Sequence, residues 1–377
     1  MLKIGIYGGT FNPPHKEHIL LVVNAIKELS LDKMFVIPTS VSPHKQSKQV
    51  ASGSDRLNML KLAFNSYDNI EVSDYEIVKQ GISYTYQTIE HFTNIYSGSE
   101  LYYFVGSDML ENFPKWKNPE YIASKVNMVL CQRKGDNLDT KTIVEEYQKL
   151  YGKGVTVLEF FGDKLSSTNV RIKSKLNLDI TEDTTKEIAT YITKNNLYSP
   201  TGYYSFVVEK LPQKRIKHTY GVINLAIKLA KKLGVDSEKV EIASLLHDIA
   251  KYENYLDYPS FKVEKDVPKD VIHQFLGEYI CRNELNITDE EILSAVKYHT
   301  TGRANMSLIE KIVFVSDLIE EGRTFNGVEE LRTAVFNDFE SGFNLCISEI
   351  YKFLLRDKKE VYYLTKEAYN YYCSDKK

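Results

Sequence analysis

The pattern of apolar residues changes partway along this chain of 377 residues. In the first half, short apolar runs such as residues 34–38 and 101–106 alternate with segments of helical periodicity. Such alternation is typical of a doubly wound parallel sheet with helices on both faces. From about residue 203 the strand-like runs end, and apolar residues follow helical spacing only. The sequence therefore predicts an α/β domain with a parallel sheet, followed by an all-α domain.

The expected elements of the first half can be given by residue number. We expect strands at 2–7, 34–38, 101–106, 127–131 and 155–158, and helices at 17–29, 54–66, 84–96 and 140–151. A segment rich in Asn, Ser, Pro and Gly at 195–202 marks the boundary between the halves. A chain of this length is expected to hold two domains. We therefore predict one domain over 1–200 and a second over 203–377.

Composition excludes several classes of protein. The net charge of −3 argues against a dedicated nucleic-acid binder, which is usually basic. No apolar run approaches the length of a membrane span, and the beginning of the chain lacks the apolar region of a signal peptide. The four cysteines are far apart, so neither a zinc ribbon nor a disulfide framework is indicated. We expect a cytoplasmic protein without nucleic-acid or membrane partners, and a homo-oligomer is compatible with the sequence.

The first eighteen residues predict a phosphate site. An apolar run at 2–7 leads into Gly8 and Gly9, and a helical pattern begins near His15 and His18. Adjacent glycines let backbone N–H groups approach a polyphosphate, and a helix N-terminus attracts anions. The histidines are three positions apart and share one helix face, from which they can stabilise a phosphorus-centred transition state. A turn that merely carries surface histidines is the alternative.

A second anion site is indicated near the end of the first domain. Ser166, Ser167 and Thr168 supply hydroxyls at an expected helix start, and Arg171 follows on the same face. Hydroxyls cap a helix or bind phosphate oxygens, and an arginine can pair with two oxygens at once. In isolation, an ordinary N-cap would be the better explanation of this segment. Together with the first site, it describes a bound nucleoside triphosphate.

These two segments resemble the bacterial nicotinate-nucleotide adenylyltransferases, and the resemblance covers roughly residues 1–200. Further matches are Pro43-His44-Lys45, Asp55-Arg56-Leu57, Ser83-Tyr84-Thr85, Gly106-Ser107-Asp108 and Trp116-Lys117. The resemblance implies transfer of an adenylyl group from ATP to nicotinate mononucleotide, with Mg²⁺, giving deamido-NAD and pyrophosphate. No covalent nucleophile is needed, because positioning and charge stabilisation suffice.

The resemblance also implies roles for individual residues. His15 and His18 would be catalytic, contacting the ATP phosphates. The ATP- and phosphate-binding residues would be Gly8, Gly9, Thr10, Phe11, Lys45, Ser166, Ser167, Thr168 and Arg171. Nicotinate mononucleotide would be bound by Thr85, Asp108 and Trp116, with the indole stacked on the pyridine ring. A core aromatic is the alternative for Trp116.

Two positions depart from the family pattern. Glu17 stands where the family usually has glycine, and Gln87 stands where it tends to have aspartate. A carboxylate at residue 17 would repel the triphosphate unless its side chain turns away. We therefore expect Glu17 to raise the KM for ATP.

The second half places metal-binding side chains on apolar helix faces. Any one of them is more often a satisfied buried residue than a ligand. Taken together they predict a site for one or two divalent ions of the iron, manganese or zinc type, suited to hydrolysis of phosphate esters or anhydrides. The expected ligands are His218, His247, Asp248, His273, His299 and Asp317.

This order of ligands resembles the HD-domain metal phosphohydrolases. The segments 245–251, 298–303 and 317–320 resemble more particularly the bacterial symmetrical diadenosine tetraphosphate hydrolases, over roughly residues 205–370. The resemblance implies cleavage of diadenosine tetraphosphate into two ADP at an iron or manganese centre. Lys251 would be catalytic, and Arg215 and Arg303 would bind the polyphosphate. A regulatory nucleotide-binding module, or a hydrolase for another nucleotide, is the alternative.

Overall fold

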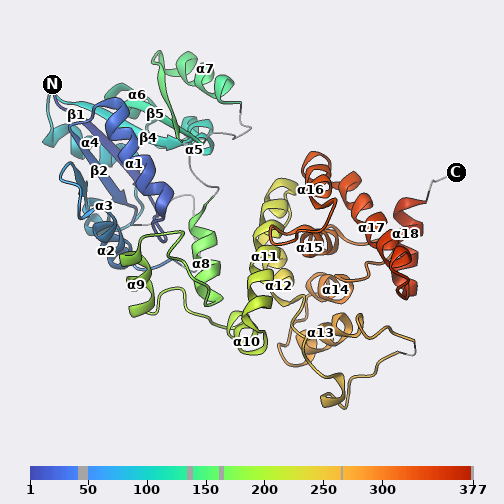
Figure 1. Ribbon diagram of the computed structural model, residues 1–377. Helices are drawn as coiled ribbons and strands as arrows, with labels where there is room; N and C mark the ends of the chain where they lie inside the picture. The colour runs from blue at the N-terminus through green and yellow to red at the C-terminus, as the bar shows by residue number, and fades with distance from the viewer. Residues whose placement is uncertain (41–49, 134–138, 161–164, 265, 375–377) are drawn as a thin grey trace. The chain divides into compact units, whose positions relative to one another are not determined.

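The computed structural model describes residues 1–40, 50–133, 139–160, 165–264 and 266–374 (Figure 1). The chain divides into two compact units. The first comprises Met1–Ser174 and Asp179–Ser199, and the second Lys175–Leu178 and Pro200–Lys377. Among the described residues, no helix is both long and apolar enough to cross a membrane.

The first unit is built on a parallel sheet of six strands in the order β3-β2-β1-β4-β5-β6. The strands are β1 (Lys3–Gly9), β2 (Lys33–Pro38), β3 (Ile70–Val72), β4 (Glu100–Gly106), β5 (Asn127–Arg133) and β6 (Val155–Phe160). The order reverses direction between β1 and β4, the place where doubly wound sheets bind ligands at their carboxyl ends. The predicted α/β architecture is confirmed.

Helices cover both faces of this sheet (Figure 1). They are α1 (Lys16–Leu29), α2 (Gly53–Phe64), α3 (Tyr75–Lys79), α4 (Thr85–Ile95), α5 (Ser107–Glu111), η1 (Phe113–Lys115), α6 (Pro119–Lys125), α7 (Thr140–Tyr151), α8 (Ser167–Lys175) and α9 (Lys186–Lys194). Alternate residues of β2 enter different cores: Met34 packs on the α1 side, and Phe35 on the α4 side.

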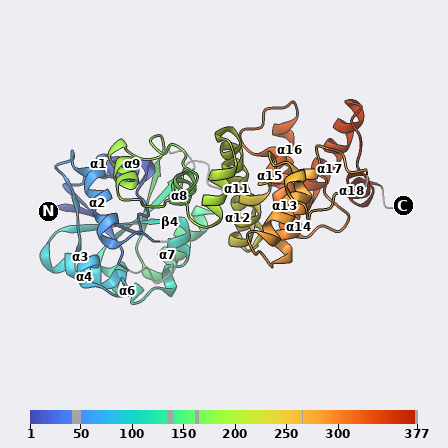
Figure 2. The same ribbon diagram turned by 90° about the horizontal axis from the view of Figure 1, so that it is seen from below.

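The second unit contains only helices among its described residues, which confirms the predicted change of class. They are α10 (Tyr203–Lys210), α11 (Gln213–Leu233), α12 (Ser237–Leu246), η2 (Tyr255–Asp257), α13 (Ile272–Asn283), α14 (Glu290–Tyr298), α15 (Leu308–Ile319), α16 (Val328–Asn337), α17 (Phe339–Arg356) and α18 (Tyr363–Cys373). Helix α11 packs against α12 and α15, and α14 packs against α12, α13 and α15 (Figure 2). The apolar faces of these helices therefore meet at one centre.

Candidate active sites

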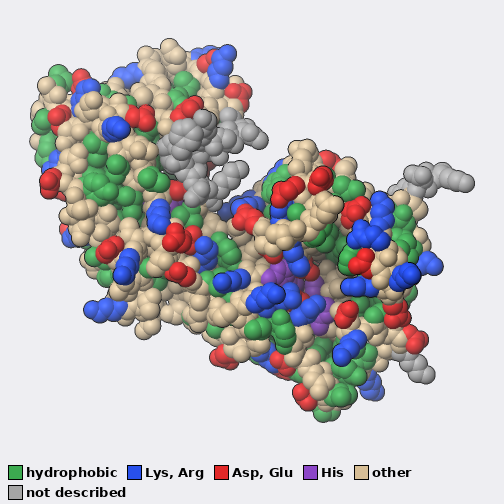
Figure 3. All heavy atoms as spheres, in the orientation of Figure 1, with side chains coloured by type: hydrophobic (Ala, Val, Ile, Leu, Met, Phe, Trp, Pro, Cys, Tyr) green, Lys and Arg blue, Asp and Glu red, His purple; other side chains and the backbone are tan. Residues whose placement is uncertain are grey.

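The metal-ligand residues predicted in the second unit lie close together. His218 lies in α11, His273 in α13 and Asp317 in α15. His247 and Asp248 directly follow α12, and His299 directly follows α14, so three of these side chains project just beyond a helix end. Histidine side chains gather at one place on the surface of this unit, with Lys and Arg side chains beside them (Figure 3).

Asp248 connects two sets of ligands. Its Oδ2 atom lies 3.4 Å from Nε2 of His247 and 3.9 Å from Nε2 of His218. Its Oδ1 atom lies 3.4 Å from Nε2 of His273 and 3.5 Å from Nε2 of His299. The potential ligand atoms of each set lie within 4.8 Å of one another. One carboxylate thus belongs to both potential metal-binding groups.

Asp317 belongs with the first of these sets. Its Oδ1 atom lies 3.0 Å from Nε2 of His218 and 3.9 Å from Nε2 of His247. The first set therefore offers two imidazoles and two carboxylates, and the second offers two imidazoles and the shared Asp248. Such mixed nitrogen and oxygen donors suit iron, manganese or zinc ions.

Neighbouring groups hold three of the imidazoles in a ligand orientation. Nδ1 of His247 donates to the carbonyl of Ser244, and Nδ1 of His299 donates to the carbonyl of Val296, both at 2.7 Å. Nδ1 of His218 lies 3.1 Å from Oε1 of Glu320. A histidine held through Nδ1 presents the lone pair of Nε2 to a metal ion. In all three histidines, Nε2 is the ring nitrogen that lies near Asp248.

Burial and the neighbouring charged groups together set the protonation of this cluster. Burial lowers the pKa of His247, and it holds the pKa of His273 well below the usual value, so both imidazoles stay neutral. At His218 burial is outweighed by the carboxylates of Asp317 and Glu320, which raise the pKa. Burial acts to raise the pKa of Asp248, but the neighbouring imidazoles hold it well below the usual range. A neutral imidazole beside an ionised carboxylate is the state that binds metal ions.

The donor set fits a divalent cation. Nε2 of His247 and Oδ1 of Asp248 are buried and have no hydrogen-bond partner among the described residues. Buried polar atoms without partners are costly. A cation bound between these side chains would satisfy both atoms. The residues present therefore fit the metal centre that the sequence predicts.

Three cationic side chains face the ligand cluster. Nη1 of Arg215 lies 2.7 Å from Oδ2 of Asp248, and Nζ of Lys251 lies 3.1 Å from Nε2 of His273. Nη2 of Arg323 lies 2.7 Å from Oδ1 of Asp317. Arg215 and Lys251 were predicted from the sequence, but Arg323 was not, because it lies in a loop outside every apolar stripe. These groups together can neutralise a polyphosphate at the cluster.

Arg303 has a different environment. Its Nε and Nη2 atoms donate to the carboxylate of Glu310 at 2.7 and 3.0 Å, and Glu310 is itself buried. The guanidinium also lies over the ring of Tyr298. The guanidinium of Arg303 is thus held by a carboxylate that is not a metal ligand, and its role in polyphosphate binding stays a prediction.

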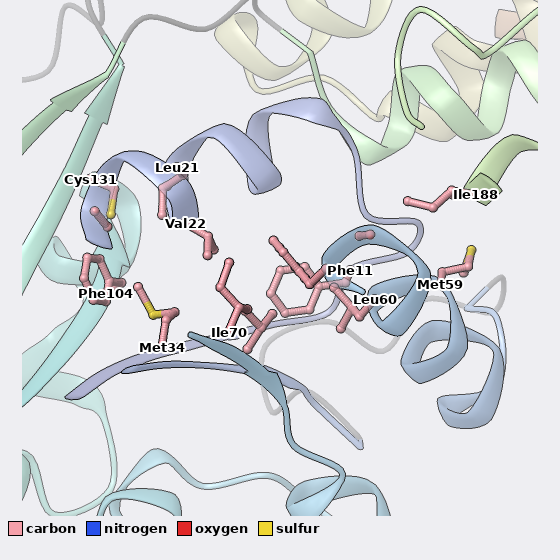
Figure 4. Close-up of a cluster of buried hydrophobic side chains, with 14 of the residues drawn as sticks. Phe11, Leu21, Val22, Met34, Met59, Leu60, Ile70, Phe104, Cys131 and Ile188 are labelled. Carbon is pink, nitrogen blue, oxygen red and sulfur yellow. The ribbon is translucent and has the colours of Figure 1, made fainter. Parts of the chain in front are cut away.

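In the first unit, a tight turn connects β1 to α1. A Cβ atom on Gly9 would lie 2.9 Å from the ring of Phe11, so glycine lets that ring fold back beneath the strand end. Phe11 has a φ of 47° and packs in the core beside α1 and α2 (Figure 4). Because its side chain is buried, any contact of Phe11 with ATP would come through its backbone.

The two predicted catalytic histidines lie at the start of α1. Their ring centroids are 3.7 Å apart, and the backbone N–H of His15 donates to Nδ1 of His18 at 3.1 Å. A ring nitrogen that accepts a hydrogen bond carries no proton, so the proton of neutral His18 lies on Nε2. His18 is therefore prepared to donate to an anion at the N-terminus of this helix.

The second predicted anion site is joined to this turn. Oγ of Ser167 donates to the carbonyl of Pro13 at 2.8 Å, and Nη1 of Arg171 donates to the carbonyl of Asn12 at 2.7 Å. Nη2 of Arg171 donates to Oγ1 of Thr168 at 3.1 Å. Ser166 caps the start of the helix by accepting the backbone N–H of Asn169. The structure thus brings the two predicted anion-binding segments together.

Glu17 does not point away from the protein. Its side chain is 3% exposed, and Oε1 accepts the backbone N–H of Leu165 at 3.3 Å. Its carboxylate therefore connects the start of α1 to the segment just before α8. The sequence indicates only repulsion of the triphosphate by this residue and gives no sign of its contact with Leu165.

Arg56 is a further residue whose role the sequence analysis missed. Its guanidinium is buried and donates to the carbonyls of Thr10, Thr39 and Ala51 at 2.9, 2.7 and 3.1 Å. Burial lowers its pKa. One side chain thus joins the chain segments that follow β1 and β2. The sequence did offer one sign of its importance, because Arg56 lies in Asp55-Arg56-Leu57, a segment that matches the adenylyltransferase family.

The predicted mononucleotide-binding residues lie at the carboxyl side of β4. Thr85 begins α4, with Oγ1 3.4 Å from the Tyr103 hydroxyl, and Asp108 is exposed in the first turn of α5. Trp116 packs against Phe113, while its indole nitrogen is buried without a partner among the described residues. Trp116 thus packs against the core of the first unit, and its stacking on the pyridine ring stays a prediction. Lys45 lies outside the described residues.

Fold and sites define a class of protein: a nucleotide-binding α/β domain joined to a helical domain with a metal-ligand cluster. Residues 6–173 match the cytidylyltransferase-like family model, and residues 215–322 match the HD-domain model. A protein of Mycoplasma genitalium, named as a probable nicotinate-nucleotide adenylyltransferase/Ap4A hydrolase, is 30% identical over 85% of this chain and 88% of its own length. The chain belongs to this family of two-domain proteins.

Two further relatives each match one half. A probable nicotinate-nucleotide adenylyltransferase of Clostridium tetani is 38% identical over 52% of this chain and 100% of its own length. A crystal structure from Clostridium acetobutylicum, titled a predicted HD superfamily hydrolase involved in NAD metabolism, is 34% identical. It covers 46% of this chain and 95% of that chain, with a TM-score of 0.43.

Proposed function

We propose that this chain is a bifunctional enzyme. Its first domain, over residues 1–200, transfers an adenylyl group from ATP to nicotinate mononucleotide. Its second, over residues 203–377, hydrolyses diadenosine tetraphosphate (Ap4A) to two ADP. The observation that carries the proposal is the complete ligand cluster around Asp248 in a chain related over most of its length to an adenylyltransferase/Ap4A hydrolase. A helical half that only senses nucleotides would not need two ligand sets.

In the adenylyl transfer, the mononucleotide phosphate attacks the α-phosphorus of ATP and pyrophosphate leaves. His18 donates through Nε2 to the phosphates, and the N-terminus of α1 stabilises the negative charge that develops. Arg171 and Lys45 hold phosphate oxygens, and Mg²⁺ enters with the ATP. The contacts of Ser167 and Arg171 with the turn 12–13 support the proposal, because they align both anion-binding segments.

In the hydrolysis, the two ligand sets that share Asp248 would hold divalent ions, iron or manganese. Bound ions of this type neutralise phosphate charge and supply an activated water. Arg215, Lys251 and Arg323 bind the polyphosphate around them, and Lys251 stabilises the departing ADP. Cleavage at the centre of a symmetrical substrate requires that an ADP unit extend to each side of the cluster.

End-product analysis tests the hydrolase. The purified chain is incubated with Ap4A and Mn²⁺ or Fe²⁺, and the products are separated by chromatography. We expect ADP as the sole product, whereas ATP plus AMP would contradict the proposal.

The adenylyltransferase is tested in parallel by release of pyrophosphate from ATP, with nicotinate and nicotinamide mononucleotide as alternative acceptors. Failure to release pyrophosphate with either acceptor would reject that activity.

A further inference from the structure

A cavity of about 480 Å³ lies next to the metal-ligand cluster, in the loop between α15 and α16 and the first turn of α16. Arg323 connects the two features. Its side chain lines the cavity, and its Nη2 atom lies 2.7 Å from Oδ1 of Asp317. The cavity is open to solvent on one side, and residues of a single chain segment, between 321 and 332, line it. One side chain, Arg323, therefore contacts both the cluster and the cavity.

The chemistry of the cavity is unlike that of the cluster. Phe325 lines it and is 42% exposed, so its ring is accessible to a ligand in the cavity. Glu321, Asn326 and Glu330 line it as well, and two arginines, Arg323 and Arg332, are part of its charged lining. Carboxylates repel phosphate groups, but they accept hydrogen bonds from hydroxyl and amino groups. The cavity thus suits an uncharged, flat group that carries donors.

Hydrogen bonds from two arginine side chains to backbone carbonyls hold the wall of the cavity in place. Nε of Arg332 donates to the carbonyl of Ile319, and Nη2 of Arg332 donates to the carbonyl of Arg323, both at 2.9 Å. Nε of Arg323 donates to the carbonyl of Asp317, also at 2.9 Å. The loop that carries Phe325 is therefore tied at both ends. A preformed wall lowers the cost of ordering a ligand.

We propose that this cavity binds the nucleoside end of one half of the dinucleotide, with the purine stacked on Phe325 and the ribose hydroxyls directed to the carboxylates. The assignment rests on the proposed hydrolase function, since it takes the polyphosphate to lie at the cluster. Arg323 stands between the two regions and contacts the phosphate that joins them. Phe325 is a binding residue and takes no part in the chemical step.

Phe325→Ala and Phe325→Trp test the assignment, with Phe353→Ala as the matched control. Phe353 lies on α17, is 39% exposed and does not line the cavity. Base stacking on an aromatic ring contributes about 1–3 kcal/mol, so we expect Phe325→Ala to raise the KM for Ap4A roughly tenfold. The kcat should stay near that of the wild type. Phe325→Trp should restore the KM, and Phe353→Ala should leave it unchanged.

Titration calorimetry with Mn²⁺ present separates stacking from damage to the metal centre. Wild-type protein should bind ADP more tightly than pyrophosphate, and Phe325→Ala should lose most of that difference while its pyrophosphate affinity and metal content stay constant. An unchanged KM and ADP affinity in Phe325→Ala would overturn the assignment, and so would an equal loss of ADP and pyrophosphate binding. If the wild type fails to cleave Ap4A, the hydrolase proposal fails, but the calorimetric comparison still tests the cavity.

Discussion

The two candidate sites are built in different ways. In the first unit, Arg56, Ser167 and Arg171 donate to backbone carbonyls of the turn between β1 and α1, so these side chains shape a backbone that meets the ligand. In the second unit the functional side chains face one another, and several contacts lie between ligand atoms. The first site therefore depends on loop geometry, and the second on the identity of its ligands. Loss of one side chain should therefore change the activity of the first site only in part, but abolish the activity of the second.

The largest expected effect follows from removing the shared ligand. Asp248→Asn removes the charge that both ligand sets use, and we expect Ap4A hydrolysis to fall about a thousandfold, since the metal centre supplies several kcal/mol of charge stabilisation. Release of pyrophosphate by the first domain should stay within about twofold of wild type. Elemental analysis should show loss of bound metal. An equal fall in both activities would show that the sites are not independent.

Removal of metal should destabilise only the second unit. Nε2 of His247 and Oδ1 of Asp248 then remain buried without a partner. Metal at a thousand times its dissociation constant stabilises the fold by about 4 kcal/mol, so chelation should lower the melting temperature of the second unit by roughly 10 °C. Differential scanning calorimetry with and without a chelator would measure this shift. A shift in the transition of the first unit would contradict the expectation.

A smaller effect is expected from Gly221→Ala. A Cβ atom at Gly221 would lie 2.2 Å from Oε2 of Glu320, so the carboxylate that orients His218 would have to move. Loss of such a partner costs about 10–100-fold in metal affinity. Metal titration should show weakening in the first ligand set, while the set of His273 and His299 is retained. Gly154→Ala, where a Cβ atom meets nothing within 4 Å, is the control and should leave both sets intact.

Much of the fold could be predicted from sequence because periodic burial is a local signal. The helix expected at 17–29 is α1 (Lys16–Leu29), and that expected at 140–151 is α7 (Thr140–Tyr151). The residues of the cluster around Asp248 could be singled out for the same reason, because charged and histidine side chains interrupt otherwise apolar helix faces; that they bind metal stays a prediction. Short elements such as α3 and α5 carry too few residues to show a period.

Other features depend on contacts between distant residues, which no local pattern contains. Glu17 contacts Leu165, which lies 148 positions away, and Glu320 contacts His218 across 102 positions. Arg323 gains its place at the cluster because α15 ends at Ile319 and the chain turns back toward Asp317. The partner of each of these side chains is set by tertiary structure alone.

The smallest expected effect concerns Glu17. Substitutions there separate the effect of its negative charge on ATP binding from the effect of its contact with Leu165. Glu17→Gln keeps an oxygen that can accept the N–H of Leu165 and removes the negative charge near the phosphates, so we expect the KM for ATP to fall about threefold with kcat unchanged. Glu17→Gly removes the charge and the contact with Leu165 together. The gain in ATP binding from lower repulsion should then be offset by a less ordered start of α8, and we expect a lower kcat. Steady-state kinetics of both variants would measure this. If the KM for ATP is the same in Glu17→Gln and in the wild type, the charge has no effect on ATP binding. Glu17 would then act only through its hydrogen bond to the backbone of Leu165.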